Sequence, residues 1–528
     1  MSFALSDLLR GVEGAAVSRA ADVTVNDVRD DSRLVRPGDL FVAVPGETQD
    51  GRAFVADAAA RGATVVVTEG AAPSGFPGVI VTVPRARSAL GVMAANRFGA
   101  AGALSLLAVT GTNGKTTTTY LVESMLRAAG RAAGVIGTVS YRLSTAAGAP
   151  AIARPAPLTT PGALVLHGLF AEMRAAGATD VVLEASSHAL EQGRLDGCQF
   201  RVGALTNLTQ DHLDFHGTMA TYFEAKAILF ERLLEPGRGV GVMFVDKEEG
   251  VRMRARCKGP TLGVARAPGA AGADVVGGPA VMDAHGIRVT FETPKGPVQV
   301  ASPLVGDFNV ENLALAVGVG IAAELPVAAI EAGLARLPGV PGRLERVANE
   351  RDVLCVVDYA HTPDALERAI AAVRPLARGR LVVVFGCGGD RDRGKRPLMG
   401  QVAARGADLA IVTSDNPRSE DPDTIIDMIV PGLESGGARA ISAAEAEGLS
   451  GLPRGGAGRL YCREPNRRAA IRLATAVATP GDLVLIAGKG HEDYQIVGAT
   501  KSHFDDREEA AAAFVRAGRA RQGRGDVA

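Results

Sequence analysis

Short apolar runs alternate with amphipathic stretches along most of the chain. In the first hundred residues, runs such as DLFVAV and GVIVTV are followed by a helical pattern, RSALGVMAANRFGA. Later runs such as LSLLAVT and DLVLIAGKG are apolar at nearly every position, and helical stretches separate them. Uninterrupted apolar strands spaced by helices are typical of parallel sheets that are covered on both faces. The pattern therefore predicts an α/β fold.

The same pattern divides the chain into three sections. At 528 residues the chain is too long for a single core, since domains average about 150 residues. We expect a smaller mixed α/β domain over residues 1–101, and a central domain with a P-loop ATPase-like parallel sheet over 102–340. Proline and glycine in the segment LPGVPGR break any continuing helix and mark the next boundary. A C-terminal, Rossmann-like α/β domain then follows over 341–528.

Two segments lack a periodic pattern. The glycine- and alanine-rich stretch RAPGAAGADVVGGPAVMDAHG is expected to be a loop, with a small antiparallel element after it. The end of the chain, from about residue 516, carries several arginines and no apolar face, so it cannot bury enough surface to order itself. We therefore expect a disordered tail there.

Composition narrows the class of protein. Hydrophobic residues make up 47% and charged residues 22%, as in ordinary soluble proteins. A net charge of −1 and the scarcity of aromatic residues, 4% in all, argue against a nucleic-acid partner. The sequence shows no signal-peptide pattern and no apolar run long enough for a membrane helix, so membrane insertion is not expected. Five scattered cysteines without metal-ligand spacing indicate reduced thiols in the cytoplasm.

The strongest chemical motif follows the apolar run LSLLAVT and precedes an amphipathic helix. Its spacing is G-x-x-G-K-T, which is shorter than the general phosphate loop G-x-x-x-x-G-K-[ST]. Glycines let backbone N–H groups curl around phosphate oxygens, the lysine reaches the β- and γ-phosphates, and the next threonine can ligate Mg²⁺. The residues predicted to bind ATP here are Gly111, Thr112, Asn113, Gly114, Lys115, Thr116 and Thr117.

With a phosphate loop that reads TGTNGKT, the sequence resembles the Mur ligases, and further motifs carry the resemblance over nearly the whole chain. It is most similar to the members that add the third peptide residue to a UDP-N-acetylmuramoyl substrate. The resemblance implies an ATP-dependent amide ligase that forms ADP and phosphate through an acyl phosphate, in peptidoglycan precursor synthesis. A monomer is expected.

By this resemblance, the segment DSRLVRPGDLFVAVPGETQDG holds the uridine nucleotide of the substrate. The motifs LTTPG and EASSHALEQGR are assigned to its muramoyl-dipeptide. Hydroxyl, amide and guanidinium groups suit a sugar and carboxylates. The implied contacts to UDP-N-acetylmuramoyl-L-alanyl-D-glutamate are Ser32, Glu47, Thr48, Gln49, Thr159, Thr160, Ser186, Gln192 and Arg194.

ATP chemistry on a carboxylate brings several anions together, so a metal ion is needed to offset their repulsion. Glu184 ends the apolar run DVVLE, and His212 lies in the polar segment NLTQDHLDFHG. The resemblance assigns both residues to Mg²⁺, together with Thr116. It also implies that Lys226 is carbamylated by CO₂, which turns an ammonium into a carboxylate that can approach the metal. Lys115, Lys226, Glu184 and His212 form the expected catalytic set.

The resemblance places further ATP contacts near the end of the central section and beyond it. Asn309 and Asn312 lie three residues apart, on one face if the segment is helical. The similarity assigns them to the adenine side of the site, and assigns Arg343 to a phosphate. Asp358 and His361, in VVDYAHTPD, follow a strand, where α/β sheets usually present functional groups.

The motif TSDNPRSEDP discriminates best between members of the family. Asp415, Asn416, Pro417 and Arg418 match the DNPR signature of the members that add meso-diaminopimelate, and lysine-adding members lack that arginine. An arginine fork can hold the distal carboxylate of diaminopimelate with two hydrogen bonds. The remaining residues that the resemblance assigns to this amino acid are Arg391, Gly488 and Glu492.

Two local departures from the family pattern bear on contacts rather than on the core chemistry. The segment MFVDKEEG lacks the asparagine and paired aspartates often found there, and Asn466 stands where an aspartate usually precedes arginine. Three other interpretations stay open at this point: a related ligase that adds L-lysine, a folylpolyglutamate synthetase, and a catalytically silent nucleotide-binding scaffold.

Overall fold

The computed structural model describes residues 2–19, 23–46, 49–70, 75–144, 150–283, 285–449 and 458–525. The chain divides into two compact units. The first comprises Met1–Pro279, Val289–Val300 and Glu311–Arg336, and the second comprises Ala280–Arg288, Ala301–Val310 and Leu337–Ala528. The longest segment of the second unit thus begins close to the boundary expected at residue 341.

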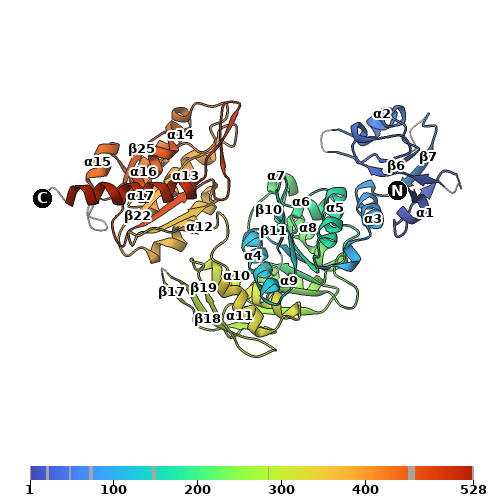
Figure 1. Cartoon of the computed structure of the whole chain (residues 1–528), viewed down its shortest axis with the longest axis horizontal. Helices are drawn as coiled ribbons and strands as arrows, with labels where there is room; N and C mark the ends of the chain where they lie inside the picture. Colours follow the sequence, from blue (N-terminus) through green and yellow to red (C-terminus); the bar gives the residue numbers. More distant parts are fainter. Residues whose placement is uncertain are drawn as a thin grey trace. The chain divides into compact units, whose positions relative to one another are not determined.

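The start of the chain forms a small mixed sheet within the first unit (Figure 1). In spatial order its strands are β2 (Ala16–Val17), β7 (Val79–Val83), β6 (Val65–Glu69), β5 (Leu40–Val42) and β4 (Val28–Arg29). Only the pair of β2 and β7 is antiparallel. The other elements here are β1 (Phe3–Ala4), β3 (Thr24–Val25), α1 (Leu5–Leu8), α2 (Val55–Ala60) and α3 (Ala86–Phe98). Apolar residues of β5, β6 and β7 pack against Leu90 and Met93 of α3, which form one core with them.

A larger sheet follows along the chain. Its strands are β8 (Ser105–Thr110), β9 (Ala133–Ile136), β10 (Ser140–Ser144), β11 (Pro150–Pro155), β12 (Asp180–Glu184), β13 (Val202–Leu205), β14 (Val240–Phe244), β15 (Thr261–Ala265), β16 (Val275–Gly277), β17 (Val281–Asp283), β18 (Gly286–Glu292) and β19 (Val298–Ser302). Their spatial order is β11-β10-β9-β12-β8-β13-β14-β15-β16-β18-β17, with β19 beside β18. All neighbours from β9 to β16 are parallel. Strand β8 lies between β12 and β13. Ligands of parallel sheets usually bind outside the carboxyl ends of the strands, so the carboxyl end of β8 is where a ligand is expected.

Helices cover both faces of this sheet because its strands are apolar on both sides. They are α4 (Lys115–Ala128), α5 (Ala163–Ala175), α6 (Ser187–Glu191), α7 (Leu213–His216), α8 (Met219–Arg232), α9 (Glu248–Arg256), α10 (Phe308–Ala322) and α11 (Val327–Arg336). On one face, Leu106 and Ala108 of β8 share a core with Phe170 of α5 and Phe230 of α8. Each buried aromatic side chain there stabilises the fold by about 2–3 kcal/mol.

One expectation about this region is wrong in part. The glycine-rich stretch before residue 286 was expected to be a loop, yet it contains the short strands β16 and β17. Val275 of β16 is fully buried and pairs with Val264 of β15. Neighbouring strands supply the hydrogen bonds that make this segment extended, and local composition carries no sign of them. The small antiparallel element expected after it begins with β18, which runs antiparallel to β16 and β17 and also pairs with β19.

The second unit contains a third sheet. Its strands are β20 (Glu345–Val347), β21 (Leu354–Asp358), β22 (Leu381–Phe385), β23 (Leu409–Val412), β24 (Arg439–Ala440), β25 (Leu460–Arg463) and β26 (Leu483–Ala487), and β27 (Tyr494–Val497) pairs separately with β28 (Thr500–His503). The spatial order is β20-β21-β26-β22-β23-β25-β24, parallel except at β20. The predicted α/β fold with parallel sheets is therefore confirmed.

Successive residues of these strands serve two cores, since side chains alternate across a strand. Val383 and Leu485 face one core, and Val382 and Val484 face the other. The covering helices are α12 (Pro363–Val373), α13 (Lys395–Gly406), α14 (Pro422–Ser435), α15 (Ala443–Gly448), α16 (Arg467–Val477) and α17 (Asp506–Gly525).

Helix α17 extends into the region where the sequence indicated a disordered tail. It begins at Asp506, buries Ala510 and Phe514 one turn apart, and continues to Gly525. The buried stripe anchors its first turns, and the arginine-rich end continues the same helix. Among the helices that the structure describes, none is both long and apolar enough to cross a bilayer.

Candidate active site

The phosphate loop connects β8 to α4 at the carboxyl edge of the central sheet. Gly111 has φ 139° and Gly114 has φ 85°, a backbone conformation that favours glycine. A Cβ atom on Gly111 would overlap Thr206, and one on Gly114 would overlap Asn312. Glycine is therefore required at both positions of the shortened motif, for backbone conformation and for space. Thr117 lies buried in the first turn of α4.

The side chain of Lys115 is folded over this loop. Its Nζ atom donates hydrogen bonds to the carbonyl oxygens of Gly111 and Thr112, both at 2.9 Å. The segment after β13 holds Asn113 in place, because the backbone nitrogen of Asn113 donates a hydrogen bond to Oδ1 of Asn207 at 3.0 Å. The predicted ATP-binding residues of the motif thus form one compact turn at the end of β8.

Glu184 lies beside the loop because the register of β12 pairs it with Val109 of β8. The carboxylate is 1% exposed and accepts hydrogen bonds from Thr116 Oγ1 at 3.1 Å, Thr138 N at 2.9 Å and Thr138 Oγ1 at 3.0 Å. The Thr138 hydroxyl also lies 3.1 Å from that of Thr159. Two of the residues expected at Mg²⁺ are therefore in direct contact.

Lys226 of α8 is buried beneath the phosphate loop rather than solvated. It is 1% exposed, and its Nζ atom donates to the carbonyl oxygen of Gly111 at 3.0 Å and lies 4.3 Å from the centre of the Tyr222 ring. Burial, assisted by the charge of Lys115, lowers the pKa of Lys226 well below its ordinary value, although Asp211 opposes the shift. The structure thus favours the neutral amine at this position.

His212 approaches the same region from the segment before α7. Its backbone has φ 53°, its side chain is about half exposed, and its ring centre lies 5.0 Å from that of His188 and 6.3 Å from that of Tyr222. Within the described part of the chain, no group of three or more His, Cys, Asp or Glu side chains is placed to hold a metal ion. Acidic and imidazole groups alone therefore do not assemble the expected metal set.

Four residues assigned to the muramoyl-dipeptide share one hydrogen-bond network. Thr160 Oγ1 lies 3.2 Å from Ser186 Oγ. Arg194 Nη1 donates to the carbonyl oxygen of Thr160 at 2.8 Å, and Arg194 Nη2 donates to Gln192 Oε1 at 2.7 Å. Since Thr160 Oγ1 also donates to the carbonyl oxygen of Glu184 at 2.6 Å, the network adjoins the predicted metal residues.

The residues assigned to the uridine nucleotide are only partly described. Ser32 is 6% exposed, and its hydrogen bond holds the pKa of Asp57 below the ordinary value. Gln49 is exposed. Glu47 and Thr48 lie outside the described residues.

Asn309 and Asn312 both lie in α10, so this segment is helical and the two residues share one face of the helix. They are 1% and 7% exposed, and Asn312 Oδ1 lies against Gly114. Lys247, in the segment that departs from the family pattern, pairs with Glu311 of the same helix at 2.7 Å. The departure therefore places an ion pair next to the helix that carries both asparagines.

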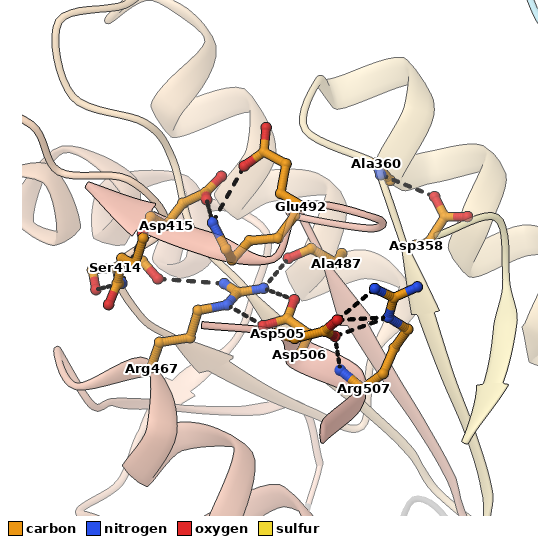
Figure 2. Close-up of polar contacts among 12 residues, drawn as sticks. Asp358, Ala360, Ser414, Asp415, Arg467, Ala487, Glu492, Asp505, Asp506 and Arg507 are labelled. Carbon is orange, nitrogen blue, oxygen red and sulfur yellow. Dashed lines mark hydrogen bonds and ion pairs between the residues drawn. The ribbon is translucent and has the colours of Figure 1, made fainter. Parts of the chain in front are cut away.

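In the second unit, Asp358 ends β21 and accepts a hydrogen bond from the backbone nitrogen of Leu344 at 2.8 Å. It also accepts one from the backbone nitrogen of Ala360 at 2.9 Å (Figure 2). Burial raises the pKa of Asp358, although the charge of Arg343 opposes the shift. Burial also lowers the pKa of His361, three residues further along. The structure thus brings Arg343, Asp358 and His361 together at the carboxyl edge of the third sheet.

Two loops at this edge carry most of the residues assigned to diaminopimelate. We call residues 413–418, after β23, the first loop, and residues 488–492, after β26, the second loop. Asn416 Nδ2 donates to Glu492 Oε2 at 3.0 Å. Lys489, whose side chain is fully buried, donates to Asn416 Oδ1 and Glu492 Oε2, each at 3.2 Å, and lies 3.7 Å from Asp415 Oδ1. The two loops therefore form one polar cluster.

Arg418 ends the first loop with a left-handed backbone, φ 52°. Its Nη1 atom donates to the carbonyl oxygen of Gly389 at 2.8 Å. A Cβ atom on Gly388 would lie 3.0 Å from Arg418 Nη1 and 3.6 Å from Arg391 Cγ, so both arginines flank this glycine. The carbonyl oxygen of Pro417 packs on Gly389.

Sequence reasoning missed several residues of these clusters. The ring of Tyr222 contacts Lys226, and its hydroxyl oxygen lies 3.2 Å from Thr112 Oγ1. Burial raises the pKa of Tyr222 to about 12. His216 Nε2 lies 2.9 Å from Ser187 Oγ. A signal existed for these residues, since each lies within four positions of a predicted one. Thr138 offered none, because only the sheet brings it to Glu184.

Comparisons with known proteins give the same family for successive segments of the chain. Three family models match: "Mur ligase family, catalytic domain" over residues 24–98, "Mur ligase middle domain" over 109–320, and "Mur ligase, glutamate ligase domain" over 342–490. A relative from Geobacter metallireducens, named UDP-N-acetylmuramoyl-L-alanyl-D-glutamate--2,6-diaminopimelate ligase, is 45% identical over 97% of this chain and 98% of its own length. A relative of the same name from Gloeobacter violaceus is 44% identical over 94% of this chain and 95% of its own length.

Solved structures show the same similarity. One structure of a ligase with that name has a TM-score of 0.70 at 32% identity, covering 98% of this chain and 99% of its own. A folylpolyglutamate synthase from Mycobacterium tuberculosis, solved with ADP, has a TM-score of 0.58 at 17% identity, covering 81% of this chain and 94% of its own, and it shares the fold alone. Because relatives match it at 44–45% identity over nearly its full length, this chain belongs to the Mur ligase family.

Proposed function

We propose that this chain is an ATP-dependent ligase that adds meso-diaminopimelate to UDP-N-acetylmuramoyl-L-alanyl-D-glutamate during peptidoglycan precursor synthesis. The observation that carries the substrate choice is the polar cluster of the first and second loops. There Arg418 offers a guanidinium for a carboxylate, and Asp415 and Glu492 offer carboxylates for an ammonium. Diaminopimelate carries both kinds of group at its distal end, whereas lysine carries only the amine.

The proposed reaction has two steps. The side-chain carboxylate of the D-glutamyl residue attacks the γ-phosphorus of ATP, which forms an acyl phosphate and releases ADP. Lys115, at the turn of the phosphate loop, stabilises the charge on the transferring phosphoryl group. The neutral amine of diaminopimelate then attacks the acyl carbon, phosphate leaves, and the nitrogen loses a proton as the amide forms.

The residues around the phosphate loop fit the expected metal. Thr116, Glu184 and His212 supply oxygen and nitrogen donors, and the buried amine of Lys226 is suited to carbamylation because its neutral form is favoured. In that modification the nitrogen of the neutral Lys226 amine bonds to the carbon of CO₂ and releases a proton, so an anion replaces a neutral group beside the loop. A bound Mg²⁺ would offset the negative charge of the ATP phosphates.

The remaining assignments belong to the same proposal. The substrate and ATP contacts are those expected from the sequence, on domains 1–101, 102–340 and 341–528. We propose a monomeric enzyme of the cytoplasm.

Phosphate release from ATP, Mg²⁺ and the UDP-muramoyl-dipeptide tests this function, with meso-diaminopimelate and L-lysine compared as acceptors. Release with diaminopimelate and little with lysine would support the proposal. Arg418→Lys keeps the positive charge but loses the fork, so we expect it to lower kcat/KM for diaminopimelate by about 100-fold. Equal release with lysine would overturn the acceptor assignment, and no release with either would indicate a silent scaffold.

A further inference from the structure

A fully buried ion pair lies beneath the first and second loops. Arg467 is the first residue of α16 and Asp506 is the first residue of α17, and neither side chain is exposed. Arg467 Nε donates to Asp506 Oδ1 at 2.8 Å, and Arg467 Nη2 donates to Asp506 Oδ2 at 2.6 Å. Taking two charges out of water is costly, so such a pair is weak evidence for stability and can instead fix a geometry.

The same guanidinium also reaches the base of each loop (Figure 2). Arg467 Nη1 donates to the carbonyl oxygen of Ser414 at 3.3 Å, one residue before Asp415. Arg467 Nη2 donates to the carbonyl oxygen of Ala487 at 3.0 Å, one residue before Gly488. One planar group therefore sets the spacing between the carboxyl ends of β23 and β26.

The loops have little freedom to compensate for a shift at their bases. Gln495 Nε2 donates to the carbonyl oxygen of Asp415 at 2.8 Å. Gly488 has φ 122°, and an added Cβ there would lie 3.2 Å from Asp415 Oδ2. Because the loops also meet through Asn416 and Glu492, a change in their spacing would move the groups assigned to the amino acid.

Packing around the first loop is incomplete. A half-open pocket of about 300 Å³ adjoins the loop and is lined among others by Ser414, Pro417, Arg467 and Gln495. A segment that borders such a pocket has no packing neighbours on that side. The hydrogen bonds from Arg467 therefore supply a restraint that van der Waals contacts do not.

We infer that Arg467 and Asp506 are positioning residues for the acceptor amino acid, and that through them α17 forms part of the diaminopimelate site. The inference rests on the proposed function. It also accounts for the departure at Asn466. Asn466 Oδ1 accepts from Ala469 N at 3.1 Å and caps α16, as an aspartate would, so the position of Arg467 is retained.

Three variants test this inference. Asp506→Asn keeps the shape but leaves the Arg467 charge unpaired, and Arg467→Lys keeps the charge but cannot reach Asp506 and both carbonyl oxygens. Asp506→Glu keeps the charge and displaces it by one methylene, and it is the mildest change if the others fail to fold. We expect each to raise the KM for meso-diaminopimelate about tenfold or more, with the KM for ATP and for the UDP-muramoyl-dipeptide within about twofold of wild type.

The chain offers a matched control in the same unit. Arg380 and Asp482 form a second buried pair at 2.7 Å, with side chains 6% and 3% exposed. Arg380 donates to the carbonyl oxygens of Leu449 and Val477, both outside the first and second loops. Arg380→Lys and Asp482→Asn should lower the melting temperature comparably and leave the KM for diaminopimelate unchanged.

A selective rise of that KM in the Arg467 and Asp506 variants would support the inference. An unchanged KM in any folded variant of this pair would overturn it, and so would an equal rise in the control pair. Wild type is assayed beside them with diaminopimelate and lysine. If wild type shows no diaminopimelate-dependent release, the proposed function fails instead, so the two failures are distinguishable.

Discussion

At the scale of single residues, buried polar groups at the carboxyl ends of strands define the chemistry of both units. Glu184 and Asp180 illustrate this on one strand, β12. Asp180 begins the strand, is 0% exposed and pairs with Arg131 at 2.7 Å. Glu184 ends it and faces the phosphate loop. Two carboxylates with similar burial therefore differ in role because of the end of the strand that they occupy.

This difference gives a prediction with an internal control. Glu184→Gln removes the charge and turns an amide donor toward Thr116 or Thr138, so we expect ligation to fall about 100-fold. Asp180→Asn should leave kcat within about threefold, although it weakens a buried ion pair. Initial rates and melting temperatures of the two variants are compared. Equal loss of activity in both would contradict the role of Glu184.

A second residue-scale prediction concerns His167, which is buried in the core of the first unit, edge-on to Phe170. Burial lowers its pKa to about 4, from an ordinary value of 6.5. As the pH falls below 6.5 the unfolded chain binds a proton that the folded chain does not, so stability is lost between pH 6.5 and pH 4. The loss amounts to about 2 kcal/mol by pH 5.

We therefore expect His167→Leu to reduce the loss of stability between pH 7 and pH 5, measured by denaturant unfolding at each pH. Exposed His285→Leu serves as the control, because it also removes one histidine. If both variants lose as much stability as wild type on acidification, His167 is not the cause.

At the scale of elements, close helix packing behind the phosphate loop depends on one glycine. Helix α11 packs on α4, the helix that begins at Lys115. A Cβ atom on Gly333 of α11 would lie 2.6 Å from the backbone nitrogen of Met125 in α4. The helices can approach this closely only because position 333 carries no side chain.

Gly333→Ala should therefore destabilise the protein by about 1–3 kcal/mol, the usual cost of overpacking. Helix propensity alone predicts the opposite sign, a gain of about 1 kcal/mol. Gly102→Ala, where an added Cβ has no neighbour within 4 Å, is the control and should change stability by less than about 0.5 kcal/mol. Unfolding midpoints distinguish the two, and a stabilised Gly333→Ala would refute the packing argument.

At the scale of the whole molecule, the two compact units separate the nucleotide loop from the amino-acid loops. Units with their own cores can unfold in separate steps, and a ligand stabilises the unit that binds it. We expect calorimetry to resolve two transitions. ADP with Mg²⁺ at 100 times its dissociation constant should stabilise the first unit by about 2.7 kcal/mol. It should not do so in Lys115→Ala.

The same calorimetry experiment shows which transition belongs to which unit. Asp482→Asn leaves the buried charge of Arg380 unpaired in the second unit, at a cost of about 3–5 kcal/mol, and should lower the transition that ADP raises less, because the phosphate loop lies in the first unit. A single transition shifted by both changes would show that the units unfold together.

The sequence by itself determined the α/β class, the phosphate loop and the family, because these depend on local patterns. An apolar strand or a glycine-lysine turn can each be recognised within ten residues of sequence. Local patterns failed for β16, whose extended form depends on its neighbours in the sheet, and for residues beyond 516, where α17 continues past its buried stripe.

Only the tertiary structure decided which distant side chains meet. Thr138 reaches Glu184, and Arg467 reaches Asp506, Ser414 and Ala487, across many intervening residues. The fold also buries Lys226 under the phosphate loop and lowers its pKa, which no local pattern in the sequence indicates. The physical reason is that burial and hydrogen bonding are set by strand order and helix packing, which long-range contacts fix and short sequence patterns do not.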